Sequence, residues 1–236
     1  MYHDIPQRLA RVRERIADAA GRCGRRPGDV RLIAVSKTHP IDAVRAAAEA
    51  GQVDFGENKV QEALQKIALS TDTRLRWHLI GHLQSNKAKK AAGVAHAIHA
   101  IDSVDLLKKV DQAAAGRTIQ VLVQVDLALE ETKFGAPEAD LHGIFEEAAN
   151  CRAALMTGLM LLPPLAENPE EARRWFVRLR GVRDRLRDAG VPGEHLRELS
   201  MGMSHDFEVA VEEGATMVRV GTAIFGERSY ATTNNE

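Results

Sequence analysis

Short runs of aliphatic and β-branched residues recur along the chain and alternate with longer segments of helical periodicity. Eight of these runs predict strands, at residues 30–36, 53–55, 75–80, 95–101, 118–126, 154–159, 195–200 and 216–220. Several runs are apolar at nearly every position, which is typical of parallel strands that are covered on both faces. The pattern therefore favours a buried parallel sheet.

Between the predicted strands, apolar residues recur at the spacing of a buried helix face. The segment 58–70 carries Val60, Leu64 and Ile67 at positions i, i+4 and i+7, which predicts one buried stripe. Start signals predict further helices, which begin at Pro40, Ser103, Pro137, Pro169 and Ser204. Glycines mark the ends of three of these helices, at Gly51, at Gly116 and before Gly214.

Strands that alternate with helices indicate βαβ units and an α/β fold. Eight such units in a chain of 236 residues, after one extra N-terminal helix, predict a compact (β/α)8 barrel of the TIM type. An open doubly wound sheet stays the alternative, because a count of short strands can be wrong by one or two. We expect one barrel domain over residues 1–230 and a loose C-terminal tail over residues 231–236.

Composition and charge narrow the function classes. The chain carries 32 Lys and Arg against 33 Asp and Glu, which argues against a dedicated nucleic-acid binder. Two cysteines, Cys23 and Cys151, cannot build a disulfide framework or a four-cysteine metal site. The N-terminus lacks the apolar core of a signal peptide, and the most apolar run, 153–162, is about half a bilayer span. We expect a soluble cytoplasmic protein.

A lysine follows the first predicted strand, at the end of the barrel where functional groups gather. Lys37 ends the sequence AVSK, and an apolar rim there would lower the pKa of its amine and free it for Schiff-base chemistry. An ion-paired or solvent-directed lysine is the alternative at this position.

The last two predicted strands lead into loops that are suited to a phosphate. After the seventh strand, Gly202 allows a tight turn, and Ser204 brings a hydroxyl together with the free N–H groups of a predicted helix start. After the eighth strand, Gly221 and Thr222 add N–H groups and a second hydroxyl. Arg219 shares a strand face with Gly221 and needs an anion or an acceptor in the barrel mouth. An ordinary capped loop and a structural salt bridge are the alternatives.

Together, a rim lysine, two phosphate loops and an inward arginine favour pyridoxal 5'-phosphate (PLP) as the cofactor. Lys37 would form the Schiff base, the loops would hold the phosphate, and Arg219 would face the ring nitrogen. A barrel enzyme that acts on a sugar phosphate is an alternative, since it needs the phosphate site but no lysine adduct.

Longer stretches of the sequence resemble a known family. The stretches that carry the resemblance are RLIAVSKTHP, FGENKVQE, WHLIGHLQSNK, GLMLLPP and ELSMGMSHDFEVAVEEGATMVRVGTAIFGER. They are similar to the pyridoxal phosphate homeostasis proteins (the YggS/PROSC family). The resemblance implies a barrel like the N-terminal domain of alanine racemase, and it covers nearly the whole chain.

The resemblance also implies roles for individual residues. Lys37 would be the Schiff-base lysine, Arg219 would lie beside the pyridine nitrogen, and Asn58 would line the cofactor pocket. The further cofactor contacts that it implies are Ser200, Met201, Ser204, Gly221 and Thr222. Phe134 stands where the family commonly has a small residue, which would alter that loop.

The family has no established catalytic activity, so the resemblance implies a carrier or regulator in intracellular PLP homeostasis that also influences amino-acid pools. PLP-requiring apoenzymes would be its recipients, and we expect a monomer. A PLP-dependent racemase or lyase is the alternative, but a racemase needs two bases. Racemases of this fold take the second base from a tyrosine, and the only tyrosines here are Tyr2 and Tyr230. A histidine such as His78 or His205 could still act as a base.

Two other patterns are interpreted as structural. The pairs His78 and His82, and His96 and His99, fall on strand-like segments and predict ordinary polar or rim histidines rather than a metal site. Seven arginines between residues 173 and 187 predict a solvated helix face with acidic neighbours such as Glu170 and Asp184. The buried face of that helix would carry Trp175, Leu179, Val182 and Leu186.

Overall fold

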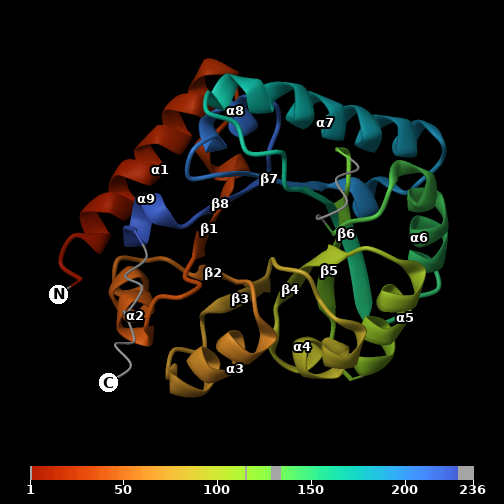
Figure 1. Ribbon diagram of the computed structural model, residues 1–236, viewed down its shortest axis with the longest axis horizontal. Helices are drawn as coiled ribbons and strands as arrows, with labels where there is room; N and C mark the ends of the chain where they lie inside the picture. Colours follow the sequence, from red (N-terminus) through yellow and green to blue (C-terminus); the bar gives the residue numbers. More distant parts are fainter. Residues whose placement is uncertain (1, 115, 129–133, 228–236) are drawn as a thin grey trace, which may run out of the picture.

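Eight parallel strands close into a barrel in the computed structural model, which describes residues 2–114, 116–128 and 134–227 (Figure 1). Each strand pairs with the next along the chain, and β1 pairs with β8 to complete the ring. The strands are β1 (Arg31–Val35), β2 (Asp54–Glu57), β3 (Arg76–Leu79), β4 (Ala97–Ile101), β5 (Ile119–Val125), β6 (Ala154–Leu161), β7 (Glu198–Met203) and β8 (Met217–Val220). Closure confirms the predicted barrel and excludes the open sheet.

Helices surround the barrel on the outside (Figure 1). The α-helices are α1 (Ile5–Arg22), α2 (Ile41–Glu49), α3 (Val60–Leu69), α4 (Ala88–Val94), α5 (Val104–Ala113), α6 (Leu141–Ala148), α7 (Arg173–Asp188), α8 (Phe207–Glu212) and α9 (Thr222–Phe225). Short 3-10 helices are η1 (Pro27–Asp29), η2 (Ser85–Lys87), η3 (Glu138–Asp140), η4 (Pro169–Ala172) and η5 (Gly193–Leu196). The extra N-terminal helix is α1, and the expected tail at 231–236 lies outside the described residues. Among the described helices, none is long and apolar enough to span a bilayer.

The local signals predicted the position of most elements. The Ser103 hydroxyl accepts a hydrogen bond from the Leu106 backbone N–H and caps α5, as its place in the sequence predicts. The prediction for Ser204 is wrong. The helix after β7 begins at Phe207, and Asp206 precedes it. The Ser204 hydroxyl instead accepts from the backbone N–H of Gly221, across the barrel rim.

The buried faces of two helices differ from the predicted stripes. On α3, Val60 and Ala63 are buried together with Lys66, whereas Leu64 and Ile67 are only partly buried. A lysine can occupy this face because its ammonium group finds buried oxygen partners there. On α7, the buried stripe uses Phe176 in place of the neighbouring Trp175, which is half-buried; the other three positions are as predicted.

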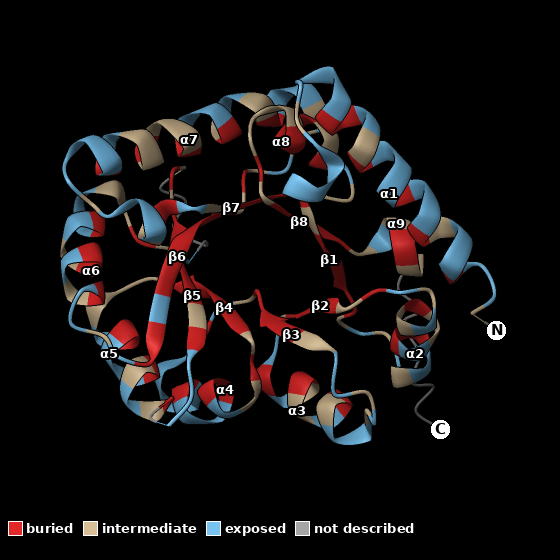
Figure 2. Ribbon diagram, turned by 180° about the vertical axis from the view of Figure 1, so that it is seen from behind, coloured by how far each residue is buried: buried red, intermediate tan, exposed pale blue. Residues whose placement is uncertain are grey.

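Two separate cores hold the barrel. The larger core lies between strands and helices, and Figure 2 shows the buried residues on the strands and on the inward faces of the helices. The smaller core lies inside the ring and consists of Ile33, Leu122, Met160 and Met217. Polar side chains share this interior, because His78, His99, Ser200 and Arg219 are also buried. The barrel is therefore apolar outside its wall and partly polar within it.

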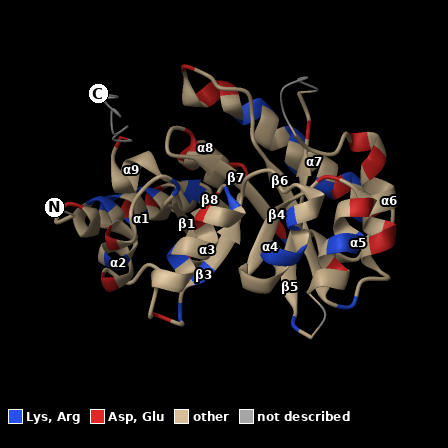
Figure 3. Cartoon of the chain, turned by 60° about the horizontal axis from the view of Figure 1, so that its bottom comes forward, with Lys and Arg blue, Asp and Glu red and all other residues tan. Residues whose placement is uncertain are grey.

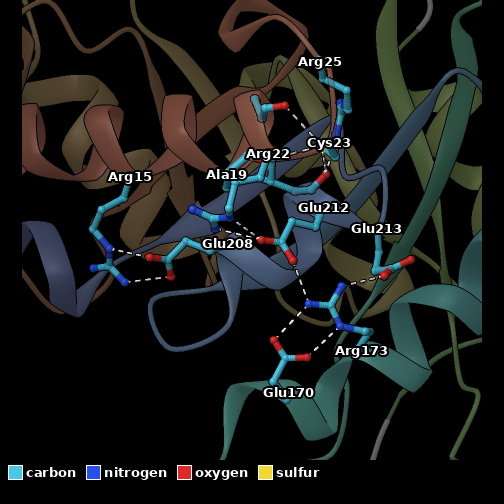
Figure 4. Close-up of polar contacts among 12 residues, drawn as sticks. Arg15, Ala19, Arg22, Cys23, Arg25, Glu170, Arg173, Glu208, Glu212 and Glu213 are labelled. Atoms are coloured by element: carbon cyan, nitrogen blue, oxygen red, sulfur yellow. Dashed lines mark hydrogen bonds and ion pairs between the residues drawn. The ribbon is translucent and has the colours of Figure 1, made fainter.

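Ion pairs tie the outer helices together. Figure 3 shows positive and negative segments interspersed along the outer helices. In Figure 4, Arg15 and Arg22 of α1 contact Glu208 and Glu212 of α8, and Arg173 of α7 reaches Glu212 as well. The arginines of α7 lie on a solvated face with acidic partners that include Glu170 and Asp184, as predicted for that run.

Candidate functional site

A cavity of about 610 Å³ opens at the carboxyl ends of the strands. Its lining comes from the ends of β1, β2, β3, β5, β6, β7 and β8 or the segments that follow them, so every strand except β4 contributes. The volume falls within the ~300–1,000 Å³ of small-molecule sites. The fold therefore gathers the segments after its strands around one ligand-sized space, at the end of the barrel where active sites of this architecture lie.

Six of the eight residues predicted to contact a cofactor line this cavity. They are Lys37, Asn58, Ser204, Arg219, Gly221 and Thr222. Ser200 and Met201 do not line it. Ser200 is buried inside the barrel and hydrogen bonded to Arg219, and Met201 packs in the core between strands and helices. Neighbouring residues of a strand point to opposite faces, so these two side chains cannot both face the interior.

Arg219 lies on β8 with its guanidinium inside the barrel, and the residue is only 2% exposed. Its Nη1 donates to the Ser200 hydroxyl over 2.7 Å, and its Nη2 donates to the backbone carbonyl of Leu161 over 2.8 Å. Burial lowers the pKa of Arg219 to about 10, which still leaves it positively charged at neutral pH. Two of the five guanidinium N–H groups are used in these bonds, so donors remain for a ligand.

The loops after β7 and β8 meet at Ser204. Its hydroxyl oxygen accepts from the backbone N–H groups of Gly221 and Ala223, at 3.1 and 3.4 Å. A hydroxyl that accepts in this way still has its own proton to donate. The turn into this loop needs Gly202, because its φ is +92° and a Cβ there would lie 2.6 Å from the Ala210 Cβ. The two segments thus form a cradle of hydroxyl and N–H donors on one side of the cavity.

A buried ionic cluster supports the segment that carries Lys37. The Lys66 ammonium donates to the Ser36 carbonyl and to the Glu57 carboxylate, each over 2.6 Å. The backbone N–H of Thr38 donates to Glu62, and Thr38 has a φ of +67°, which is unusual for a residue with a side chain. Both neighbours of Lys37 are therefore held by α3 and β2, and the lysine extends into the cavity from a braced turn.

Sequence reasoning did not place several cavity residues at the site. The imidazole of His82 stacks on the ring of Phe134 with centroids 3.7 Å apart, and both side chains lie at the mouth. Gln124 and Asp126, at the end of β5, also line the cavity. The signal for Gln124 and Asp126 was their place at the carboxyl end of a predicted strand. The pairing of His82 with Phe134 had none, because 52 positions of sequence separate them.

Four of the histidines fall into two groups. His78 and His99 are polar side chains fully buried inside the barrel rather than at its rim, and neither lines the cavity. The ring nitrogens of His78 and His99 lie 3.0 Å apart, a distance set by the pairing of β3 with β4. His82 and His205 do lie at the cavity. Among the described residues, no group of three or more His, Cys, Asp or Glu side chains could hold a metal ion.

Comparison with known proteins relates this site to a family. The family model described as "Alanine racemase, N-terminal domain" matches residues 8–229. The pyridoxal phosphate homeostasis protein of Aquifex aeolicus is 44% identical over 227 residues, which is 95% of this chain and 98% of that protein. That of Escherichia coli K12 is 40% identical over 97% of this chain and 99% of that protein.

A solved structure shows the same architecture. PipY of Synechococcus elongatus is 41% identical, over 94% of this chain and 100% of that chain. Its structure without PLP matches with a TM-score of 0.85, and its structure with PLP bound matches with a TM-score of 0.83. The chain therefore belongs to the family of the pyridoxal phosphate homeostasis proteins, which share the barrel of the alanine racemase N-terminal domain.

Proposed function

We propose that this protein binds PLP in the cavity through Lys37 and acts in PLP homeostasis. One observation carries the proposal: a lysine amine, a buried arginine and a cradle of hydroxyl and N–H donors surround a single cavity of about 610 Å³. The names of the relatives and the PLP-bound structure of PipY support it.

The residues present fit this cofactor by the chemistry of their groups. When bound, PLP supplies three groups: a pyridine nitrogen, a phosphate dianion, and an aldehyde that reacts reversibly with an amine. Lys37 would supply the amine, and Ser204 and Thr222 would donate hydrogen bonds to the phosphate. Gly221 would line the phosphate site and hold the Ser204 hydroxyl through its N–H. Arg219, with its remaining N–H groups, would donate to the ring nitrogen. Asn58 would close the side of the pocket next to Lys37.

We infer that the protein carries the cofactor rather than turning over amino acids. A cationic arginine keeps its protons at neutral pH, so the ring nitrogen beside it would accept a hydrogen bond and stay unprotonated. A neutral pyridine is a poor sink for the electrons of a carbanion. The inference predicts that the protein does not racemise L-alanine. Chiral chromatography over many hours at high protein concentration tests this. Steady turnover would instead show that the protein is an enzyme.

We also infer a monomer in the cytoplasm that donates PLP to apoenzymes. Cys23 and Cys151 are both free thiols in the structure, which suits a reducing compartment. Analytical ultracentrifugation should return a single species of the chain mass. Addition of a PLP-requiring apoenzyme to the loaded protein should restore that enzyme's activity faster than free PLP at the same concentration does.

Borohydride reduction tests the cofactor site directly. Purified protein is incubated with PLP, reduced and mapped by peptide mass spectrometry, in parallel with Lys37→Ala and with Lys59→Ala. Lys59 is an exposed lysine beside Asn58 and serves as the matched control. We expect a reduced adduct on Lys37 in wild type and in Lys59→Ala, and none in Lys37→Ala. Equal labelling of many surface lysines, or no adduct at all, would refute the proposal.

A further inference from the structure

A continuous chain of hydrogen bonds crosses the interior of the barrel and ends at Arg219. Asp54 Oδ1 lies 2.9 Å from His78 Nε2, and His78 Nδ1 lies 3.0 Å from His99 Nε2. His99 Nδ1 lies 2.9 Å from the Ser200 hydroxyl oxygen, which accepts from Arg219 Nη1 over 2.7 Å. Side chains from β2, β3, β4, β7 and β8 therefore form one connected path inside the ring.

With both imidazoles neutral, the types of group along the path allow only one arrangement of protons. A carboxylate only accepts, so Nε2 of His78 carries a proton and its Nδ1 accepts. Nε2 of His99 must then be the donor to His78, and Nδ1 of His99 must accept from the Ser200 hydroxyl. The lone pairs of Ser200 are thereby left for Arg219, which is a donor only. In every bond of the path, the donor is the group nearer to Arg219 and the acceptor is the group nearer to Asp54.

The surroundings favour the protonation states that this arrangement requires. Burial lowers the pKa of His78, and it lowers the pKa of His99 well below the usual value, so both imidazoles are neutral at neutral pH. Burial alone would raise the pKa of Asp54, but the bond from His78 and an ion pair with Arg76 bring it below its usual value. Arg76 anchors the far end, beside a cleft of about 330 Å³ at the opposite face of the barrel.

We propose that Asp54, His78, His99 and Ser200 are positioning residues, which fix the orientation of the Arg219 guanidinium below the cavity so that its unused N–H groups face the ligand. The proposal rests on PLP being the ligand of this cavity for its functional consequence, but not for the geometry of the path. The guanidinium is held at two points, by Ser200 and by the Leu161 carbonyl, and only the Ser200 contact depends on the histidines. Disturbing the path should therefore change how Arg219 meets the pyridine nitrogen without removing its charge.

The first experiment uses the ligand-free protein with 15N-labelled histidine rings. NMR should show His78 and His99 both neutral and both protonated at Nε2, with the resonances assigned by His78→Gln and His99→Gln. Ser200→Ala removes the hydroxyl that donates to His99, so the Nδ1 resonance of His99 should move. Thr157→Val is the control, because it removes a buried hydroxyl of β6 that donates to Val121 and takes no part in the path. A proton on Nδ1 of either ring, or no change in Ser200→Ala, would overturn the proposal.

The second experiment measures PLP binding to the same folded variants. Loss of one buried hydrogen bond to a charged group corresponds to about tenfold weaker binding. We expect Ser200→Ala and His99→Gln to bind PLP about tenfold more weakly and with a shifted absorption maximum, while Thr157→Val behaves as wild type. Wild-type affinity and spectrum in both variants would refute the positioning role. If wild type itself fails to bind PLP, the proposed function fails, and the NMR experiment still decides whether the path exists.

Discussion

Replacing Lys66 with methionine should strongly destabilise the protein at alkaline pH. The Lys66 ammonium is 7% exposed and contacts the Glu57 carboxylate, which is fully buried, over 2.6 Å. Methionine fills similar space but leaves the carboxylate without its cation. Breaking a buried ion pair from one side costs about 3–5 kcal/mol, because an uncompensated charge stays in the interior. For a chain of this size, that corresponds to a fall in Tm of roughly 10 °C.

The loss should depend on pH in a defined direction. Burial already raises the pKa of Glu57, and the contact with Lys66 opposes that rise. In the variant the pKa rises further, so the folded state holds a proton that the unfolded state has released. Stability of the variant then increases as pH falls from the raised folded-state pKa toward the ordinary value of about 4.3. The deficit relative to wild type should be largest at pH 8 and small near pH 5.

Urea unfolding at pH 8 and pH 5 measures the free energy of unfolding of Lys66→Met. Two further variants are measured for comparison. Adding Glu57→Gln to Lys66→Met removes the orphaned charge and should recover most of the lost free energy at pH 8. Lys109→Met removes an exposed i,i+4 pair with Asp105 on α5 and should cost less than about 0.5 kcal/mol. The reasoning is refuted if Lys66→Met lies within about 1 kcal/mol of wild type at pH 8, or if Glu57→Gln restores nothing.

Three further predictions concern other parts of the molecule. Gly202→Ala should lower the free energy of unfolding by about 1–3 kcal/mol, because φ is +92° and the new methyl group has no room. The control Gly93→Ala, in an open helical position, should be neutral or stabilising by up to about 1 kcal/mol. Because burial lowers the pKa of His78 and His99, the unfolded state binds more protons than the folded state at acidic pH. The free energy of unfolding should therefore fall as pH drops below about 6.5, and it should fall less in His99→Gln. Unfolding curves at pH 8 and pH 5.5 check this. Arg173→Ala should cost under about 1 kcal/mol, and less in 1 M salt, since its ion pairs are partly exposed; a large, salt-independent loss in chemical denaturation would contradict this.

The sequence predicted the order and type of the elements because each strand is a short apolar run between clear helix signals. It was less exact at strand ends, where propensity gives little information. The seventh strand was expected over residues 195–200 but runs over Glu198–Met203, since His195 and Leu196 belong to a 3-10 turn after Pro192. That shift also moved the start of the following helix from Ser204 to Phe207.

The site was predictable where it follows from barrel geometry alone. Lys37, Gly221 and Thr222 come directly after strands, so their place at the rim follows from the fold. To predict which of Ser200 and Met201 faces the interior, one must know which residues of β7 point inward, and that depends on its register with both neighbouring strands. His78 and His99 stood out as single polar residues within apolar runs, but their contact depends on how β3 aligns with β4. Contacts between strands were therefore the part that the sequence left open.

The polar interior of the barrel connects to the cavity through a single residue. Four apolar side chains form the inner core, and several of the other interior groups are polar, which costs stability unless each finds a partner. Within the path from Asp54 to Arg219, both carboxylate oxygens, all four imidazole nitrogens and the hydroxyl are engaged. Arg219 is the one member of the path with donors left over, and it is also the member that lines the cavity. The unused hydrogen-bonding capacity of the path thus lies at the cavity, and the cost of a polar interior is offset most fully when an acceptor occupies that space.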